Sequence, residues 1–269
     1  MYYSCIVFKR TGLPHDEFHP LENPKDQGES KVMRKKMNLM IALLAVMSVV
    51  KPASAAVHVS VVHAVPGVTV DVYVNGGLAL GNFEPETVTD FLSLPEGTYD
   101  IQVFVAGSDP TMDAPAIELL GAELPDGLNV TIVAHPAPDG ALTLTPFVND
   151  LSPTMADASP FFVNRGFGRL VLRHTAAVGK VFAEVRRFKG NLIEVGQPPQ
   201  VSLVSGQEAT YQNIAALRHF VSVLPAPGAD PAIGPASVDI AKDKMLVIYP
   251  FGPTADGELK VLVQTIDLP

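Results

Sequence analysis

The stretch Val70-Asp71-Val72-Tyr73-Val74-Asn75-Gly76 decides the fold. Valine alternates with a charged or aromatic residue over five positions, which is the period of a strand with one buried face. Asn75-Gly76 follows at once, and this dipeptide is the strongest short-range signal for a two-residue hairpin turn. We therefore expect a strand over 70–74 and its antiparallel return over 78–83.

The chain around this hairpin continues the β pattern. Glycine-containing turn dipeptides such as Asp126-Gly127 and Asp139-Gly140 separate short apolar runs, and no window shows a sustained helical period with caps. Short strands at this spacing are typical of a sandwich or barrel, so we expect all-β, immunoglobulin-like antiparallel β-sandwich domains. Further strands are predicted over 57–63, 99–105, 129–134 and 142–148.

The pattern then recurs, which indicates a duplicated domain. His63 and His174 are 111 residues apart, and the strand that begins at Val70 has its counterpart at Val181, again 111 residues away. A period above about 100 residues indicates tandem domains instead of a solenoid. The boundaries we expect are a first domain over 56–152, a linker over 153–165 and a degenerate second domain over 166–269. Within the linker, apolar Phe161-Phe162-Val163 is expected to pack against one domain or between the two.

The segment before the first strand resembles an export signal. Residues 33–55 contain a basic cluster, an apolar run over 37–50 and the small residues Ala53-Ser54-Ala55, in the order of a cleaved secretory signal. The apolar run is shorter than the ~20 residues that span a bilayer, so a retained anchor is the weaker alternative. We expect cleavage after Ala55 in a bacterial-type cell and no membrane insertion afterwards. The product would be periplasmic, surface-bound or secreted.

Residues 1–32 are polar and aperiodic, so we expect a disordered or mis-assigned extension, with Met33 as the true start. A cytoplasmic extension is the alternative. The single cysteine, Cys5, lies in this stretch, so the part after Ala55 has no thiol, disulfide or cysteine metal site.

Charge is distributed unevenly. After Ala55 the chain has 11 Lys and Arg against 23 Asp and Glu, a formal net charge of −12. Residues 56–152 contain 13 acidic residues and no Lys or Arg, whereas residues 166–269 have 10 basic and 9 acidic residues. This acidity argues against nucleic acid or an anionic membrane as partner. It serves solubility, or alternatively attracts cations or a basic partner.

Two motifs resemble the domain-of-unknown-function family 4397. One is Val61-Val62-His63-Ala64 with Pro66, followed by the strand and turn at 70–76, and the other is Phe91 to Val103 with Pro95-Glu96-Gly97-Thr98-Tyr99 inside it. The resemblance covers 57–151 well and 168–268 poorly, because Val181-Phe182-Ala183-Glu184-Val185 replaces the first signature. It implies an exported protein, often with tandem domains, and supplies no activity or catalytic residue.

Catalytic motifs are missing from the sequence. There is no Gly-x-Ser-x-Gly elbow, Ser108 falls in a turn-like segment, and Gly76-Gly77 lacks the lysine of a phosphate loop. His58 and His63 are five apart, so a strand would place them on opposite faces. His63 and His174 repeat at equivalent positions, which favours a ring nitrogen bonded to a loop backbone over catalysis. A joint site of His63 and His135 would need two adjacent strand ends.

Acidic loops leave one candidate metal site. Asp109, Asp113 and Glu118 surround a Pro-rich segment, and calcium binds oxygens from such loops. The regular calcium-loop spacing is absent, so we expect no metal or other cofactor, with calcium as the alternative. Asp71 and Tyr73 share the alternate face of their strand, where an exposed aromatic can stack on a sugar. Asn129-Val130-Thr131 matches a glycosylation pattern by chance.

These observations favour a noncatalytic exported module for binding or adhesion, with an unknown protein or glycan as partner and a monomeric or weakly self-associating state. One alternative is a structural accessory that packs on another exported protein or assembles head to tail through Arg186, Arg187 and Lys189. Another is an enzyme whose carboxylates or histidines gather from distant strands.

Overall fold

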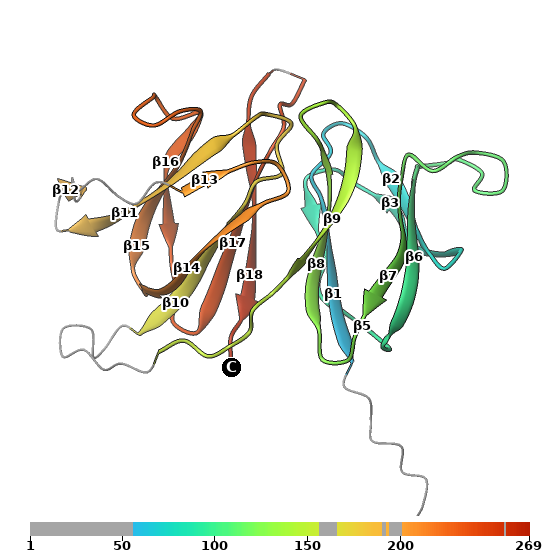
Figure 1. Ribbon diagram of the computed structural model, residues 1–269, viewed down its shortest axis with the longest axis horizontal. Helices are drawn as coiled ribbons and strands as arrows, with labels where there is room; N and C mark the ends of the chain where they lie inside the picture. Colours follow the sequence, from blue (N-terminus) through green and yellow to red (C-terminus); the bar gives the residue numbers. More distant parts are fainter. Residues whose placement is uncertain (1–55, 156–165, 190–191, 194–200, 256) are drawn as a thin grey trace, which may run out of the picture. The chain divides into compact units, whose positions relative to one another are not determined.

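The computed structural model describes residues 56–155, 166–189, 192–193, 201–255 and 257–269 (Figure 1). These residues form four β-sheets in two sandwich-like halves, within one compact unit over Ser54–Pro269. In the part of the chain that the structure describes, no helix has the length and apolar character to cross a membrane. The predicted signal segment 33–55, the extension 1–32 and the apolar linker residues 161–163 lie outside the described residues.

The first half is built from two sheets. One has the order β4 (Thr87–Val88), β1 (Val57–His63), β8 (Asn129–Pro136) and β9 (Leu142–Val148), with β5 (Leu92–Leu94) also paired to β1. The other has the order β3 (Gly77–Phe83), β2 (Val70–Val74), β6 (Gly97–Val105) and β7 (Ile117–Leu124).

The second half repeats this arrangement. One sheet has the order β14 (Glu208–Ala215), β10 (Phe167–Arg173), β17 (Lys244–Phe251) and β18 (Lys260–Asp267). The other has the order β12 (Leu192–Ile193), β11 (Val181–Lys189), β15 (Arg218–Leu224) and β16 (Ile233–Asp239), with β13 (Val201–Leu203) also paired to β11. The two halves share one strand order, which is what a duplication of the chain produces.

The strand predictions are confirmed, and so is the hairpin that decided the fold. β2 pairs antiparallel with β3, and both turn residues have the positive φ that a primed turn needs, 50° at Asn75 and 77° at Gly76. β7 was not predicted. A register shift against β6 between Tyr99 and Ile101 and a positive φ of 67° at Gly121 break the alternation of β7, so its sequence carries no clean period.

The expectation of wholly antiparallel sheets is wrong for one strand pair in each half. β1 lies parallel to β8, and β10 lies parallel to β17. Parallel neighbours need a long connection between them. In each half that connection is most of the domain, because the first strand pairs with the next-to-last one.

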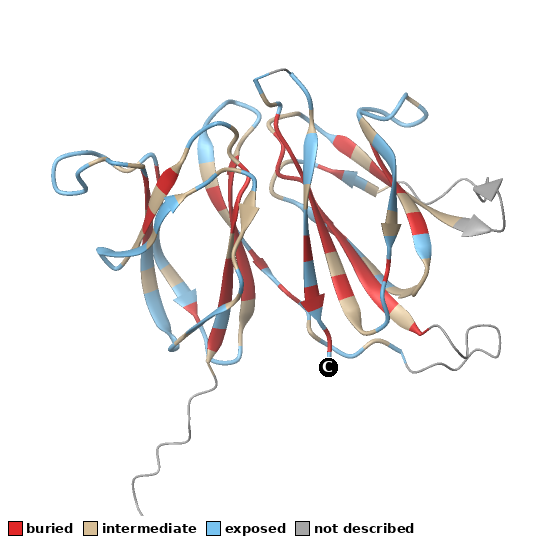
Figure 2. Cartoon of the chain, turned by 180° about the vertical axis from the view of Figure 1, so that it is seen from behind, coloured by how far each residue is buried: buried red, intermediate tan, exposed pale blue. Residues whose placement is uncertain are grey.

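Three apolar clusters of the described residues stabilise the unit. Figure 2 shows that the buried residues lie mainly on the strands, which also carry exposed residues, and that the connecting loops are mostly exposed. One cluster fills the sandwich of the first half and one fills the sandwich of the second. The third joins the halves, because residues of β1, β8 and β9 pack with residues of β10, β17 and β18. Its buried members include Val62, Val133, Phe147, Val171, Val247 and Tyr249.

Candidate functional site

The acidic loop at 109–118 forms a self-contained turn. The backbone N–H of Asp109 donates to Oδ2 of Asp113 at 2.9 Å, and the N–H and hydroxyl of Thr111 donate to Oδ1 of Asp109 at 2.9 and 2.6 Å. The Thr111 bonds lower the pKa of Asp109. Glu118 lies on β7 opposite Gln102, apart from this turn. Ser108 closes another turn, since its N–H donates to Val105 O at 3.0 Å.

Calcium at this loop stays an untested alternative to the expectation of no metal. The structure brings Asp109 and Asp113 together through a backbone bond, but it does not bring Glu118 to them. Among the residues that the structure describes, no three His, Cys, Asp or Glu side chains are grouped to hold a metal ion.

The repeated histidines have the structural role that their positions predict. His63 Nε2 is 2.7 Å from Val68 O, and His174 Nε2 is 2.8 Å from Gly179 O, so each ring bonds to the loop that follows its strand. Both rings are buried, and burial lowers the pKa of each. Neutral imidazole donating to a carbonyl fixes the loop without carrying charge into the core.

His63 and His135 do not form a joint site. β1 and β8 are adjacent, with His63 opposite Ala134. Ala134 and His63 line the interior of the sandwich, and His135, the next residue, therefore points to the other face of the sheet. There His135 contacts Thr145 Oγ1 at 2.9 Å. His58 is exposed whereas His63 is buried, as their odd spacing predicts.

Asp71, in the strand that decided the fold, organises the outer face of its sheet. Oδ1 accepts the N–H of Asn82 at 2.7 Å and Oδ2 accepts the N–H of Gly107 at 3.2 Å. Tyr73 is half-buried and meets Phe104 edge to face, with ring centroids 5.3 Å apart. Both side chains thus contact other residues of their own sheet, although the sequence suggested that they are exposed and could contact a ligand.

Asp71→Ala is expected to lower the free energy of unfolding by about 1–3 kcal/mol, because two backbone donors lose a charged acceptor. Asp71→Asn keeps one acceptor oxygen and should lose less. Urea unfolding measures the change, with Asp90→Ala at an exposed loop position as the control. Equal midpoints for Asp71→Ala and the control would contradict this role.

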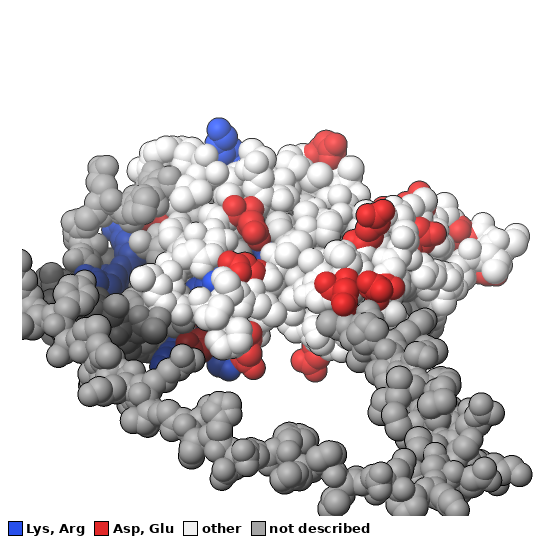
Figure 3. Space-filling model, turned by 60° about the horizontal axis from the view of Figure 1, so that its bottom comes forward, with Lys and Arg blue, Asp and Glu red and all other residues white. Residues whose placement is uncertain are grey.

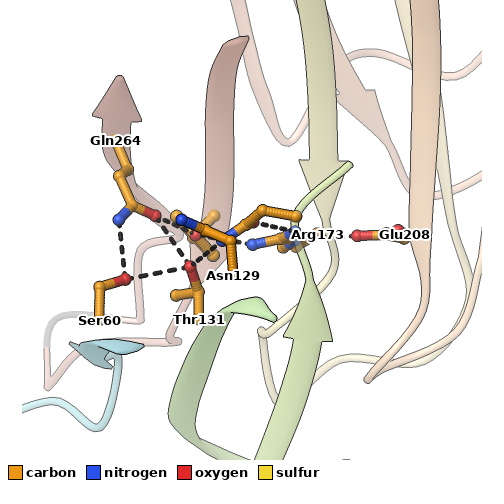
Figure 4. Close-up of polar contacts among 8 residues, drawn as sticks. Ser60, Asn129, Thr131, Arg173, Glu208 and Gln264 are labelled. Carbon is orange, nitrogen blue, oxygen red and sulfur yellow. Dashed lines mark hydrogen bonds and ion pairs between the residues drawn. The ribbon is translucent and has the colours of Figure 1, made fainter. Parts of the chain in front are cut away.

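An extended cluster of polar side chains lies between the halves, and no site was predicted there from the sequence (Figure 4). From the first half, Ser60 Oγ donates to Thr131 Oγ1 at 3.0 Å. From the second, Gln264 Nε2 donates to Ser60 Oγ at 2.9 Å, and Tyr249 OH donates to Gln264 Oε1 at 2.7 Å. Burial raises the pKa of Tyr249, so its phenol keeps the proton that it donates.

Arg173 extends this cluster. Its side chain is 1% exposed, and its guanidinium donates to Asn149 Oδ1 at 2.8 Å, to Tyr249 OH at 3.0 Å and to Glu208 Oε2 at 2.9 Å. The same group lies 4.7 Å from the centroid of the Phe147 ring. One cation thus bonds to residues of both halves. We call the cluster the inter-half network; it consists of Ser60, Thr131, Asn149, Arg173, Glu208, Tyr249 and Gln264.

The inter-half network can hold the halves in register, but it offers no open position to a substrate. Apart from Glu208, its side chains are buried, and the bonds above engage each member with another. The signal that could have revealed it is the apolar run in β8, which is buried on both faces. A strand buried on both faces belongs to a sheet covered on both sides.

A second feature is an apolar cavity of about 110 Å³ inside the first sandwich. β1, β2, β6 and β8 form its walls, with Val72, Ile101, Val103, Ile132 and Ala134 among the lining residues. His63 and Tyr99 are the lining residues with polar side-chain atoms, and both bond elsewhere, since Tyr99 OH donates to Pro95 O at 2.7 Å. The interior is therefore apolar.

The cavity opens at one edge of the sandwich. β7 and β9 are in contact and close one edge. At the other edge β3 and β5, both wholly described, make no comparable backbone contact. The exposed lining residues are on these two strands, Ala79 on β3 and Leu92, 43% exposed, on β5. We call this opening the β3/β5 mouth.

Comparison with known proteins identifies the first half. The family described as domain of unknown function (DUF4397) matches residues 57–163, so this part of the chain is a DUF4397 domain, and the second half has no family assignment. A search of curated proteins found no significant match. Among solved structures, a candidate cell adhesion protein from Bacteroides uniformis covers 81% of this chain and 100% of its own, at 10% identity and a TM-score of 0.25.

Proposed function

We propose that the protein is a noncatalytic, exported binding or adhesion module in which the DUF4397 domain and the second half form one scaffold. The observation that carries the proposal is that the buried polar side chains form their hydrogen bonds with other groups of the protein. Arg173, Tyr249 and Gln264 bond to one another between the halves, and the buried histidines bond to loop backbone or hydroxyl groups. Side chains of the types that catalyse reactions thus stabilise the fold.

Recognition in this proposal belongs to the exposed loops of the first half. On the face in Figure 3, the first half, on the right, shows Asp and Glu without Lys or Arg. Loops on a rigid sandwich are common recognition surfaces. An acidic surface favours a cationic or basic partner, so a protein or glycan with cationic groups fits it best. Export through residues 33–55 and an immunoglobulin-like relationship of each half are part of the same proposal.

The proposal is tested by thermal melts of the full-length protein with Ca²⁺, Mg²⁺, Zn²⁺ and soluble glycans, beside a hydrolase substrate screen. A ligand at 100 times its Kd adds about 2.7 kcal/mol of stability, roughly 2–4 °C for a chain of this size. Asp109→Asn with Asp113→Asn should remove a shift that depends on the acidic loop, whereas Asp126→Asn with Asp139→Asn, in glycine turns, should not. Turnover of a substrate would refute the noncatalytic function.

Self-assembly through the basic strand of the second half remains an alternative. Arg186 already pairs with Glu184 of the same strand at 2.7 Å, which leaves less of its charge for a neighbouring molecule. Light scattering that shows a monomer at all protein and salt concentrations would exclude this alternative.

A further inference from the structure

We propose that the cavity of the first half is a binding site for a slim apolar ligand without a negative charge, such as a short alkyl chain on a neutral head group. The inference goes beyond the proposed function, which places recognition on the exposed loops, and adds an internal site with its own ligand class. It depends on the cavity and on the β3/β5 mouth, both of which lie within the described residues.

The size and lining of the cavity define the ligand class. An apolar cavity of roughly 150 Å³ in another protein stays dry and binds benzene. The 110 Å³ here is on the same scale, so it takes a single ring or a few methylene groups. Water is a poor occupant, because the polar atoms of His63 and Tyr99 already have partners at 2.7 Å each. An alkyl chain replaces the missing dispersion contacts of the walls.

The β3/β5 mouth gives the ligand a way in. Leu92 is 43% exposed on one side of it, and Ala79, on β3, is the exposed lining residue on the other side. Apolar side chains left in water beside an apolar cavity lower the cost of guiding a hydrocarbon chain inside. The two rim strands have room to separate, since no hydrogen-bonded ladder joins them.

Charge at the mouth selects the head group. The segment between β3 and β5 carries the exposed acids Glu84 and Asp90, and exposed Glu96 follows β5. Residues 56–152 contain no Lys or Arg that could neutralise a carboxylate or phosphate on the ligand. Lys260 of the second half reaches the segment between β3 and β5, but it is paired with Glu86 there at 3.3 Å. A negatively charged head group held at the mouth would be repelled. The site therefore favours a neutral head group over that of a fatty acid.

The test is methyl NMR of the full-length protein, titrated with 1-hexanol and with hexanoate at pH 7.5. We expect saturable shifts of the methyl groups of Ile101, Val103 and Ile132 with 1-hexanol, and weaker binding of hexanoate. Ala134→Leu fills the cavity and should abolish these shifts. Ala141→Leu makes the same change at an exposed turn and should keep them.

Every result of the NMR titration either supports the proposed site or overturns it. Val61→Phe, on the half-exposed part of the lining, replaces Ala134→Leu if that variant loses its dispersed methyl spectrum. The site is overturned if 1-hexanol gives no saturable shift, or if both filling variants bind as the native protein does. Hexanoate binding as tightly as 1-hexanol would overturn the head-group selection. Loss of the site would leave glycan or protein binding in the melts unchanged, so the two failures are distinguishable.

Discussion

Arg173→Met should lower the free energy of unfolding by about 3–5 kcal/mol, the usual loss when one partner of a buried charged cluster is removed. The methionine fills much of the volume, but Asn149 Oδ1 and Glu208 lose their donor, and Phe147 loses the cation 4.7 Å from its ring. Because these partners come from both halves, the loss weakens the attachment of one half to the other. Urea unfolding followed by tyrosine fluorescence measures it.

The chain provides a matched control at Arg218. Its guanidinium bonds to Asp239 at 3.0 Å, but the side chains are 58% and 71% exposed. An exposed pair contributes about 0–1 kcal/mol, so Arg218→Met should change little. Equal losses for the two variants would show that burial of Arg173 between the halves contributes nothing beyond an ordinary surface ion pair.

Strand positions could be predicted because each depends on local sequence. The alternation in β2 and the Asn75-Gly76 turn specify a hairpin without reference to the rest of the chain. Pairing between distant strands could not be predicted, since β1 meets β8 through contacts about 70 residues apart in sequence, as between Ser60 and Thr131. That non-local choice is why an antiparallel arrangement was expected where the pairs are parallel.

The inter-half network and the cavity could not be predicted from the sequence, whereas the role of the repeated histidines could. Ser60 and Thr131 look like ordinary solvent-facing polar residues of alternating strands, and only the packing of β1 and β8 against the second half buries them. The role of His63 and His174 was visible, because duplication repeats a structural device at the same position. A cavity leaves no local signal, since it depends on how well eighteen side chains from several strands fill a space.

Acidification below about pH 6.5 is expected to destabilise the protein. Burial lowers the pKa of His63, His135, His174 and His219 from their ordinary value of 6.5. The unfolded chain therefore binds protons near pH 6.5, before the folded chain does. The stability that these histidines provide is complete above that pH and is lost as the pH falls toward the folded values.

Other titrating groups act in a different pH range. Hydrogen bonds from Ser152 lower the pKa of Asp150 from its ordinary 3.8, so the stability from this carboxylate is lost only below about pH 4. The Asp109 and Asp239 carboxylates are exposed and also titrate in that lower range. Urea unfolding at pH 8, 7, 6 and 5 therefore isolates the histidines.

Replacement of a buried histidine should flatten this dependence. Burial lowers the pKa of His135 most, its bond to Pro136 O raises it, and the charge of His174 lowers it further. The two rings, one from each half, would therefore repel each other once protonated. His174→Gln should thus remove both its own contribution and part of that of His135, and the fall in stability between pH 7 and 5 should shrink. His58→Gln, at an exposed position, should leave the fall unchanged. A native protein equally stable at pH 7 and pH 5 would contradict this prediction, because it would mean that folding does not change the proton affinity of the buried rings.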